Sequence, residues 1–313
     1  MRAVRRHFVG LAATVLATGV VVSQAAHGAP IRATDDGGHV VTLARPATRI
    51  VTLAPSLTEL VFAAGGGATV VGTTALSDFP KAARRIDRIG DATRLDVERV
   101  LALKPDLVLI WQRGNLGREI EQIGAAGIPL FQLEPRQLDD VPRAIERLGV
   151  LLGHDASALS RANELRAQLE GLRSAHAGAA PVRVFYQVWQ SPLMTVNRAQ
   201  MIGDALALCG GRNVFGELAP LVPVVSTEAV VAADPEAIFT ASEEGGGTSA
   251  WQRASNAPGF AAWRRHTQLT AVRRGWMFTV NGDLISRQGP RIVEGVAAIC
   301  AALDTVRRER AAR

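Results

Sequence analysis

The sequence contains two similar segments on either side of one long predicted helix, and this arrangement limits the possible folds more than any other feature. Residues 155–177 are predicted to form the helix, because Leu165, Leu169 and Leu172 recur at spacings of three and four. Asp155 is expected to cap the start of this helix. The glycine and proline within residues 178–181 are expected to end it.

The two similar segments are residues 97–110 and residues 227–239. Each segment reads as a short helix that is interrupted by proline and followed at once by a short aliphatic strand. Glu98 and Glu228 both lie seven residues before that proline. Two lobes of similar construction joined by one helix would enclose a cleft, and clefts of this kind commonly bind small ligands.

Elsewhere the chain alternates short aliphatic strands with helical segments, which is typical of an α/β fold. We therefore predict two similar lobes, each a short, mainly parallel sheet flanked by helices, joined by one long rigid interdomain helix. The predicted ranges are 49–153 for the N-terminal lobe, 154–180 for the interdomain helix and 181–313 for the C-terminal lobe, after a polar leader over 29–48. In such sheets, ligands meet the loops at the carboxyl ends of the strands.

Residues 1–28 are predicted to be a signal peptide that is removed on export. Three arginines precede an apolar run over residues 8–22, and small residues follow it. No later apolar run approaches the roughly 20 residues of a membrane span. The mature chain is therefore expected to be soluble and periplasmic, and we expect a monomer. Loss of the three arginines reduces the net charge from +6 to +3, which is too small to predict nucleic-acid binding.

The chain has two cysteines, Cys209 and Cys300. An even pair in an exported protein favours a disulfide, and both cysteines would lie in the C-terminal lobe. The alternative, two buried free thiols, stays open at this point.

The sequence lacks the common motifs of catalysis. It has no nucleophile elbow, no zinc-protease motif and no phosphate-binding loop. No histidine of the mature chain has a second histidine or a cysteine at metal-ligand spacing, and His154 and His176 are read as surface residues. Tyr186, the only tyrosine, is read as a core residue, although a tyrosine beside a cleft is able to ligate iron. We therefore predict a binding protein rather than an enzyme, with no cofactor and no metal site of its own.

Trp111 and Trp189 each follow a predicted strand, one in each lobe. A large planar ring that faces a cleft is a suitable wall for a flat and largely apolar ligand. The alternative is that these tryptophans only seal the cores of their lobes.

Glu98 and Glu228 also have two interpretations. Each glutamate near the start of a helix interacts favourably with the helix dipole, which alone is worth roughly 0.3–1 kcal/mol. The second interpretation is that each lobe presents one carboxylate to a two-fold-symmetric partner that carries arginines.

The sequence resembles the helical-backbone, metal-chelate class of periplasmic binding proteins that serve ABC importers, and within that class the members that bind cobalamin. The similarity extends over the mature chain from Arg49 to about Val306. It is carried by residues 50–64, 77–80, 97–111, 114–115 and 209–215, and by the closing helix that follows Pro290 and contains Cys300.

The resemblance implies that the cleft binds a metal chelate, with a corrinoid as the first expectation and haem or a ferric siderophore as the alternatives. It implies that Glu98 and Glu228 dock onto arginines of the two transmembrane subunits of the importer, and that Cys209 and Cys300 form a disulfide. The predicted ligand-binding residues are Ser56, Leu57, Leu76, Trp111, Trp189, Met194, Asp283 and Arg287.

Four positions depart from the pattern of the cobalamin-binding members, which carry aromatic residues where this chain has Leu76, Ala92, Met194 and Val222. The loss of four rings would remove much of the stacking wall for a corrin, whereas Leu, Met and Val keep the cleft apolar. Two alternatives of a different class are a periplasmic metal-dependent hydrolase and a sensor subunit that signals through the same two-lobe surface.

Overall fold

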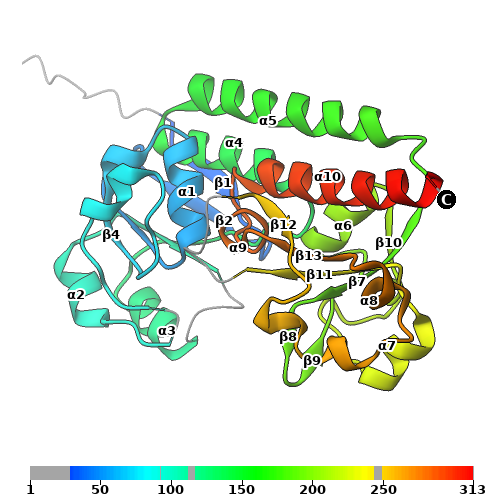
Figure 1. Ribbon diagram of the computed structural model, residues 1–313. Coiled ribbons are helices and arrows are strands. Elements are labelled where there is room, and N and C mark those ends of the chain that lie inside the picture. The colour runs from blue at the N-terminus through cyan, green and yellow to red at the C-terminus, as the bar shows by residue number, and fades with distance from the viewer. Residues whose placement is uncertain (1–28, 92, 112–116, 243–248, 313) are drawn as a thin grey trace, which may run out of the picture.

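The computed structural model describes residues 29–91, 93–111, 117–242 and 249–312, so the predicted signal peptide lies outside the described residues. Helix α5 (Asp155–His176) runs along one side of the molecule, and the two larger sheets lie below it in Figure 1. We call the halves that contain these sheets the N-lobe (residues 49–153) and the C-lobe (residues 181–313); these limits remain our proposal.

The N-lobe contains a sheet of four parallel strands in the order β4-β3-β5-β6. All four residues of β5 are buried, as expected for a parallel strand covered by helices on both faces. The strands are β3 (Ile50–Thr52), β4 (Val70–Thr73), β5 (Leu107–Ile110) and β6 (Leu130–Gln132), and the helices are α1 (Pro55–Ala63), α2 (Val97–Ala102), α3 (Gly117–Ala125) and α4 (Asp140–Leu152).

The C-lobe contains a five-stranded sheet in the order β10-β7-β11-β13-β12, in which only the edge strand β12 is antiparallel. A separate hairpin, β8 (Trp189–Gln190) and β9 (Leu193–Met194), projects from it. The strands are β7 (Val182–Gln187), β10 (Gly211–Asn213), β11 (Ala237–Ala241), β12 (Trp251–Arg253) and β13 (Met277–Val280), and the helices are α6 (Met201–Leu208), α7 (Thr227–Ala233), α8 (Thr270–Arg274), α9 (Gly282–Ile285) and α10 (Ile292–Ala311). The predicted fold, two mainly parallel sheets flanked by helices, is confirmed.

The segment that was predicted to be a polar leader is a β-hairpin. Strands β1 (Ile31–Thr34) and β2 (Val40–Leu43) pair in antiparallel fashion, and β1 packs against α4. An ion pair of 2.7 Å between Asp36 and Arg147 of α4 fastens the hairpin to the N-lobe. The strands were missed because each is only four residues long and alternates buried or half-buried residues with exposed ones.

The interdomain helix buries the predicted stripe, including Leu165 and Leu169, mainly against α4. Asp155 was wrongly expected to be its N-cap. The helix begins at Asp155 itself. This carboxylate therefore lies in the first turn, where its negative charge interacts favourably with the positive end of the helix dipole.

His176 was wrongly read as a surface residue. Only 11% of its side chain is exposed, because the ring lies between α5 and α10. Its Nδ1 atom is 2.8 Å from the carbonyl oxygen of Leu172, and its Nε2 atom is 3.3 Å from the carboxylate of Asp304.

Cys209 and Cys300 form a disulfide, which confirms the pairing that the resemblance implies. Both residues are buried. The bond joins the end of α6 to α10 and therefore closes most of the C-lobe sheet into one covalent loop.

Candidate ligand-binding site

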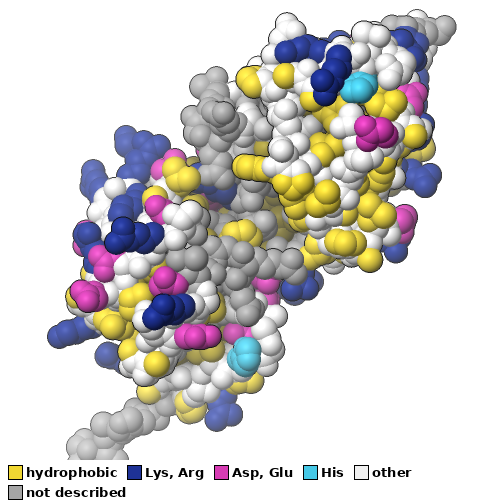
Figure 2. Space-filling model, turned by 90° about the horizontal axis from the view of Figure 1, so that it is seen from below, with side chains coloured by type: hydrophobic (Ala, Val, Ile, Leu, Met, Phe, Trp, Pro, Cys, Tyr) yellow, Lys and Arg dark blue, Asp and Glu magenta, His cyan; other side chains and the backbone are white. Residues whose placement is uncertain are grey.

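Loops at the carboxyl ends of the N-lobe strands face the C-lobe, where parallel sheets bind ligands. They border an interlobe cavity of about 110 Å³. The N-lobe contributes Trp111, Glu134, Pro135 and Arg136, and the C-lobe contributes Gln200, Met201, Leu221, Val222 and Gln288. Figure 2 shows the surface hollowed between the two halves on the side opposite α5.

The cavity is smaller than a typical small-molecule site, since such pockets measure roughly 300–1,000 Å³. A ligand of that size would therefore extend beyond this cavity.

Exposed apolar side chains are present in the segments where the sequence predicted ligand contacts. Trp189 on the β8–β9 hairpin is 61% exposed, and its indole Nε1 donates to the carbonyl oxygen of Ser191 at 3.0 Å. Met194 on the same hairpin is half-buried, and Leu76 in the N-lobe loop after β4 is 62% exposed. The exposed apolar surface of these side chains is available for contact with a ligand.

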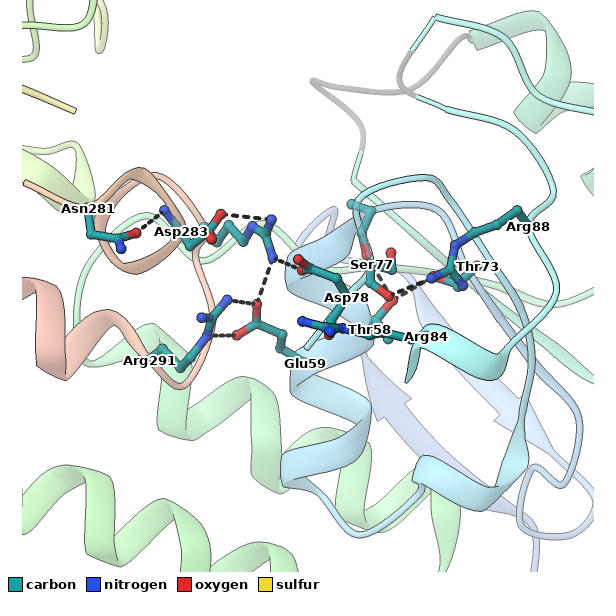
Figure 3. A network of polar contacts seen from close by, with 12 residues as sticks. Thr58, Glu59, Thr73, Ser77, Asp78, Arg84, Arg88, Asn281, Asp283 and Arg291 are labelled. Carbon is teal, nitrogen blue, oxygen red and sulfur yellow. Dashed lines mark hydrogen bonds and ion pairs between the residues drawn. The ribbon is translucent and has the colours of Figure 1, made fainter. Parts of the chain in front are cut away.

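The backbone of Leu76 has a φ angle of 64°, in the left-handed region that bulky residues rarely occupy. Such a conformation costs about 1–3 kcal/mol and is common where a loop is shaped for binding. The loop over residues 74–79 is held by an adjacent polar network. The hydroxyls of Thr52, Thr58 and Thr73 lie within 2.9 Å of one another, and Arg88 donates to the carbonyl oxygen of Ser77 at 3.0 Å (Figure 3).

The remaining residues that were discussed as candidate ligand contacts lie in different environments. Trp111 is half-buried, packs on the core and lines the cavity, and its contact with a ligand stays a prediction. Ser56 and Leu57 lie in the first turn of α1, and the side chain of Leu57 belongs to the core. Of the substituted aromatic positions, Val222 lines the cavity, whereas Ala92 lies outside the described residues.

Tyr186 is a core residue, as predicted. Its side chain is buried beside the C-lobe sheet, and burial raises the pKa of its hydroxyl well above the ordinary value.

Arg287 and Asp283 were predicted to orient polar groups of a ligand, but in this structure they contact each other and the N-lobe. A guanidinium nitrogen of Arg287 is 2.9 Å from the carboxylate of Asp283. The other terminal nitrogen is 2.8 Å from Asp78 and 3.4 Å from Glu59. Their role toward a ligand remains a prediction.

Arg291 completes this cluster. Its guanidinium group donates two hydrogen bonds to the carboxylate of Glu59, at 2.9 and 2.6 Å, in the bidentate geometry of a strong pair (Figure 3). The same group lies 4.0 Å above the centre of the Phe79 ring. Sequence reasoning gave no role to Glu59 or Arg291. A signal was present, because Glu59 is the only charged residue in helix α1.

The two acceptor carboxylates of the cluster respond differently to it. Burial raises the pKa of Glu59, although Arg291 and Arg287 oppose the rise. Burial also acts to raise the pKa of Asp78, but the hydrogen bond and the charge of Arg287 outweigh it and lower this pKa.

Glu98 and Glu228 occupy equivalent places in the two lobes. Each is exposed in the first turn of a short helix, α2 or α7, and each helix is capped by a side chain, that of Asp96 or Ser226, which accepts from a backbone amide. Backbone and Ser226 hydrogen bonds lower the pKa of Glu228. In Figure 1, α2 and α7 lie in opposite lobes, on the side of the molecule away from α5.

Within the described part of the chain, no group of three or more His, Cys, Asp or Glu residues is arranged to hold a metal ion. In the same residues, no helix has the length and apolarity needed to cross a membrane.

Comparison with known proteins gives a consistent result. Residues 50–284 match the family model described as periplasmic binding protein. The chain is 35% identical over 260 residues to a vitamin B12-binding protein of Pectobacterium atrosepticum, a match that covers 82% of this chain and 88% of the relative.

Solved structures agree with this match. The periplasmic vitamin B12 binding protein BtuF of Vibrio cholerae is 30% identical, with a TM-score of 0.73 over 84% of this chain and 98% of that one. A periplasmic haem binding protein from Pseudomonas aeruginosa is 25% identical, with a TM-score of 0.67 over 82% of this chain and 92% of that one. The fold, the interlobe cleft and these similarities together show that the chain belongs to the periplasmic binding protein family.

Proposed function

We propose that this protein captures a corrinoid such as cobalamin in the cleft between its lobes and delivers it to an ABC importer. The observation that carries the proposal is the 30–35% identity, over more than four fifths of the chain, to proteins named for vitamin B12 binding. The proposed location is the periplasm, after removal of residues 1–28.

The apolar surface of the cleft supports a large planar ligand. Trp111 and Val222 line the cavity. In the proposed complex, the exposed Trp189 and Leu76 and the half-buried Met194 supply further apolar contact area beyond it. Burial of about 25 cal/mol per Å² and stacking on an indole are the main expected sources of affinity, and a nanomolar dissociation constant requires about 12 kcal/mol in total.

Haem is the second candidate ligand. The similarity to a haem binding protein of Pseudomonas aeruginosa favours it, as does the substitution of aromatic side chains by Leu76, Met194 and Val222, which leaves an apolar cleft with fewer stacking rings. A ferric siderophore is a third chelate of the same general kind.

A fluorescence titration distinguishes these ligands. The mature protein is titrated with cyanocobalamin, haemin and ferrichrome, and the quenching of tryptophan emission is corrected for absorbance by the ligand. Saturation at one equivalent of cyanocobalamin is expected, and weaker quenching is expected in Trp111→Leu and Trp189→Leu. Saturation by haemin alone would transfer the proposal to haem, and no saturation by any of the three up to tens of micromolar would contradict it.

Trp276→Phe is the matched control for this titration. Trp276 directly precedes β13 and therefore lies at the amino end of that strand, away from the cleft. Its indole is buried and donates to Glu309 at 2.7 Å. This variant should lose total fluorescence but retain the affinity of the wild type.

Delivery is proposed to use Glu98 and Glu228 as docking groups for arginines of the two importer subunits. Their equivalent, exposed positions in α2 and α7 support this role. Reversal of both charges, Glu98→Arg with Glu228→Arg, is expected to abolish uptake by cells while the affinity for the ligand stays unchanged. Transport at the wild-type rate by this double variant would refute the docking role.

The control for charge reversal is Glu121→Arg with Glu294→Arg. Both glutamates are exposed, one on α3 and one on α10, and the double variant changes the net charge by the same amount. It should transport normally, which separates loss of the docking carboxylates from a general effect of added positive charge.

A further inference from the structure

The ionic cluster of Glu59, Asp78, Asp283, Arg287 and Arg291 joins parts of the chain that are more than 200 residues apart. Glu59 and Asp78 belong to the N-lobe, whereas Arg287 and Arg291 lie in the segment between α9 and α10 of the C-lobe. Figure 3 shows Glu59 projecting from α1 toward Arg291. The cluster is therefore a direct polar connection between the lobes.

Because the cluster is buried, its stability depends on the distance between the lobes. The Glu59 side chain is 1% exposed, and those of Arg287 and Arg291 are 5% and 15% exposed. Separation of the lobes at this point would leave buried charges unpaired until water entered, and an uncompensated buried charge is strongly unfavourable. The cluster thus favours one narrow range of interlobe distances.

The connection also adjoins the cleft. Gln288, the neighbour of Arg287, lines the interlobe cavity. The Asp78 side chain is 40% exposed at the edge of the cluster, and the Phe79 ring lies under the Arg291 guanidinium group. Movement of the cluster would therefore move residues on both sides of the cleft.

We propose that Glu59, with Asp78, Arg287 and Arg291, forms an interlobe lock that sets the width of the cleft and thereby slows ligand release. In this proposal Glu59 and Arg291 are positioning residues, since they act on the ligand through the distance between the lobes. The part that concerns ligand release rests on the proposed function, whereas the part that concerns cleft width does not.

Another polar link also joins the lobes: the carboxylate of Asp204, in the first turn of α6, accepts from the backbone amide of Leu138 at 2.9 Å. It is a single hydrogen bond from a neutral donor, whereas the Glu59 cluster pairs carboxylates with guanidinium groups through several hydrogen bonds, including a bidentate pair. The Glu59 cluster is therefore expected to dominate.

The first test measures cleft width without a ligand. Spin labels are placed on cysteines introduced by Glu121→Cys in the N-lobe and Arg265→Cys in the C-lobe, both at exposed positions. The two native cysteines do not react, because they form a disulfide. Double electron–electron resonance should give a narrow distance distribution for the otherwise wild-type protein and a broader or shifted one after Glu59→Gln.

Glu146→Gln is the matched control. Glu146 of α4 also accepts a bidentate pair, from Arg166 of α5 at 2.6 and 2.8 Å, but this pair does not join the two lobes. The distance distribution of the spin-labelled Glu146→Gln variant should equal that of the wild type. Circular dichroism verifies that each variant is folded, and Asp78→Asn, a change at the exposed edge of the cluster, replaces Glu59→Gln if that variant does not fold.

The second test measures the dissociation rate of cyanocobalamin by stopped flow. Glu59→Gln should release the ligand at least ten-fold faster than Glu146→Gln. If the wild type does not bind cyanocobalamin, the proposed function is contradicted. The distance measurement still tests whether the cluster sets the width of the cleft. Unchanged distance distributions in the folded Glu59→Gln and Asp78→Asn variants would overturn the lock, whatever the ligand proves to be.

Discussion

Removal of the disulfide by Cys209→Ala with Cys300→Ala offers a quantitative test of what stabilises the C-lobe. The two residues are 91 positions apart, and the loop that they close contains β11, β12 and β13. Without the bond, the unfolded chain gains conformational freedom, whereas the folded chain retains the contacts between α6 and α10. The loss of stability therefore arises mainly in the unfolded state.

The magnitude follows from the length of the loop. In the chain-entropy model, closing a loop of 91 residues removes about 15 cal/mol/K from the unfolded chain, which is roughly 4–5 kcal/mol at 25 °C. Both sulfur atoms are buried, so their replacement by alanine adds a smaller packing loss. Because folded domains are stable by only about 5–15 kcal/mol, this loss is a large fraction of the total.

Urea unfolding followed by far-ultraviolet circular dichroism measures the effect. With a slope of about 3 kcal/mol/M, the double variant should unfold at a midpoint about 1.5 M lower. Wild-type protein unfolded in the presence of a reductant is the control, since it keeps both sulfur atoms and loses only the bond. If the lobes unfold separately, only the C-lobe transition should move. A shift below about 0.3 M in both samples would refute the reasoning.

Three further predictions concern single residues. Asp140→Asn should reduce the free energy of unfolding by about 1–2 kcal/mol, since this carboxylate accepts from two backbone amides that precede α4. Burial acts to raise the pKa of Asp140, but those amides and Arg143 lower it, so urea unfolding should show the difference above about pH 4 and its loss as the pH falls further. Gly203→Ala should lower the melting temperature by several degrees, because its Cβ would collide with the carbonyl oxygen of Asn197. Trp189→Leu should leave the melting temperature nearly unchanged but weaken cyanocobalamin binding about ten-fold in the fluorescence titration, because the indole is exposed.

Local patterns were sufficient to predict the main elements of the fold. The spacing of Leu165 and Leu169 predicted the interdomain helix, and aliphatic runs such as β5 predicted parallel strands. The same reasoning missed the hairpins β1–β2 and β8–β9, because their strands are short and partly exposed. Pairing across a short hairpin adds few apolar residues, so periodicity detects it poorly.

Chain order and residue type by themselves determined the two-lobe α/β architecture and the matching positions of Glu98 and Glu228, each seven residues before a proline. They left the state of the two cysteines open, and only the resemblance implied the disulfide. Only the tertiary structure decided that His176 is partly buried between two helices and that Glu59 accepts from Arg287 and Arg291. The reason is physical. Periodicity and composition report which side chains avoid water, whereas an ion pair between residues more than 200 positions apart exists only once both lobes have folded and excluded water from the space between them.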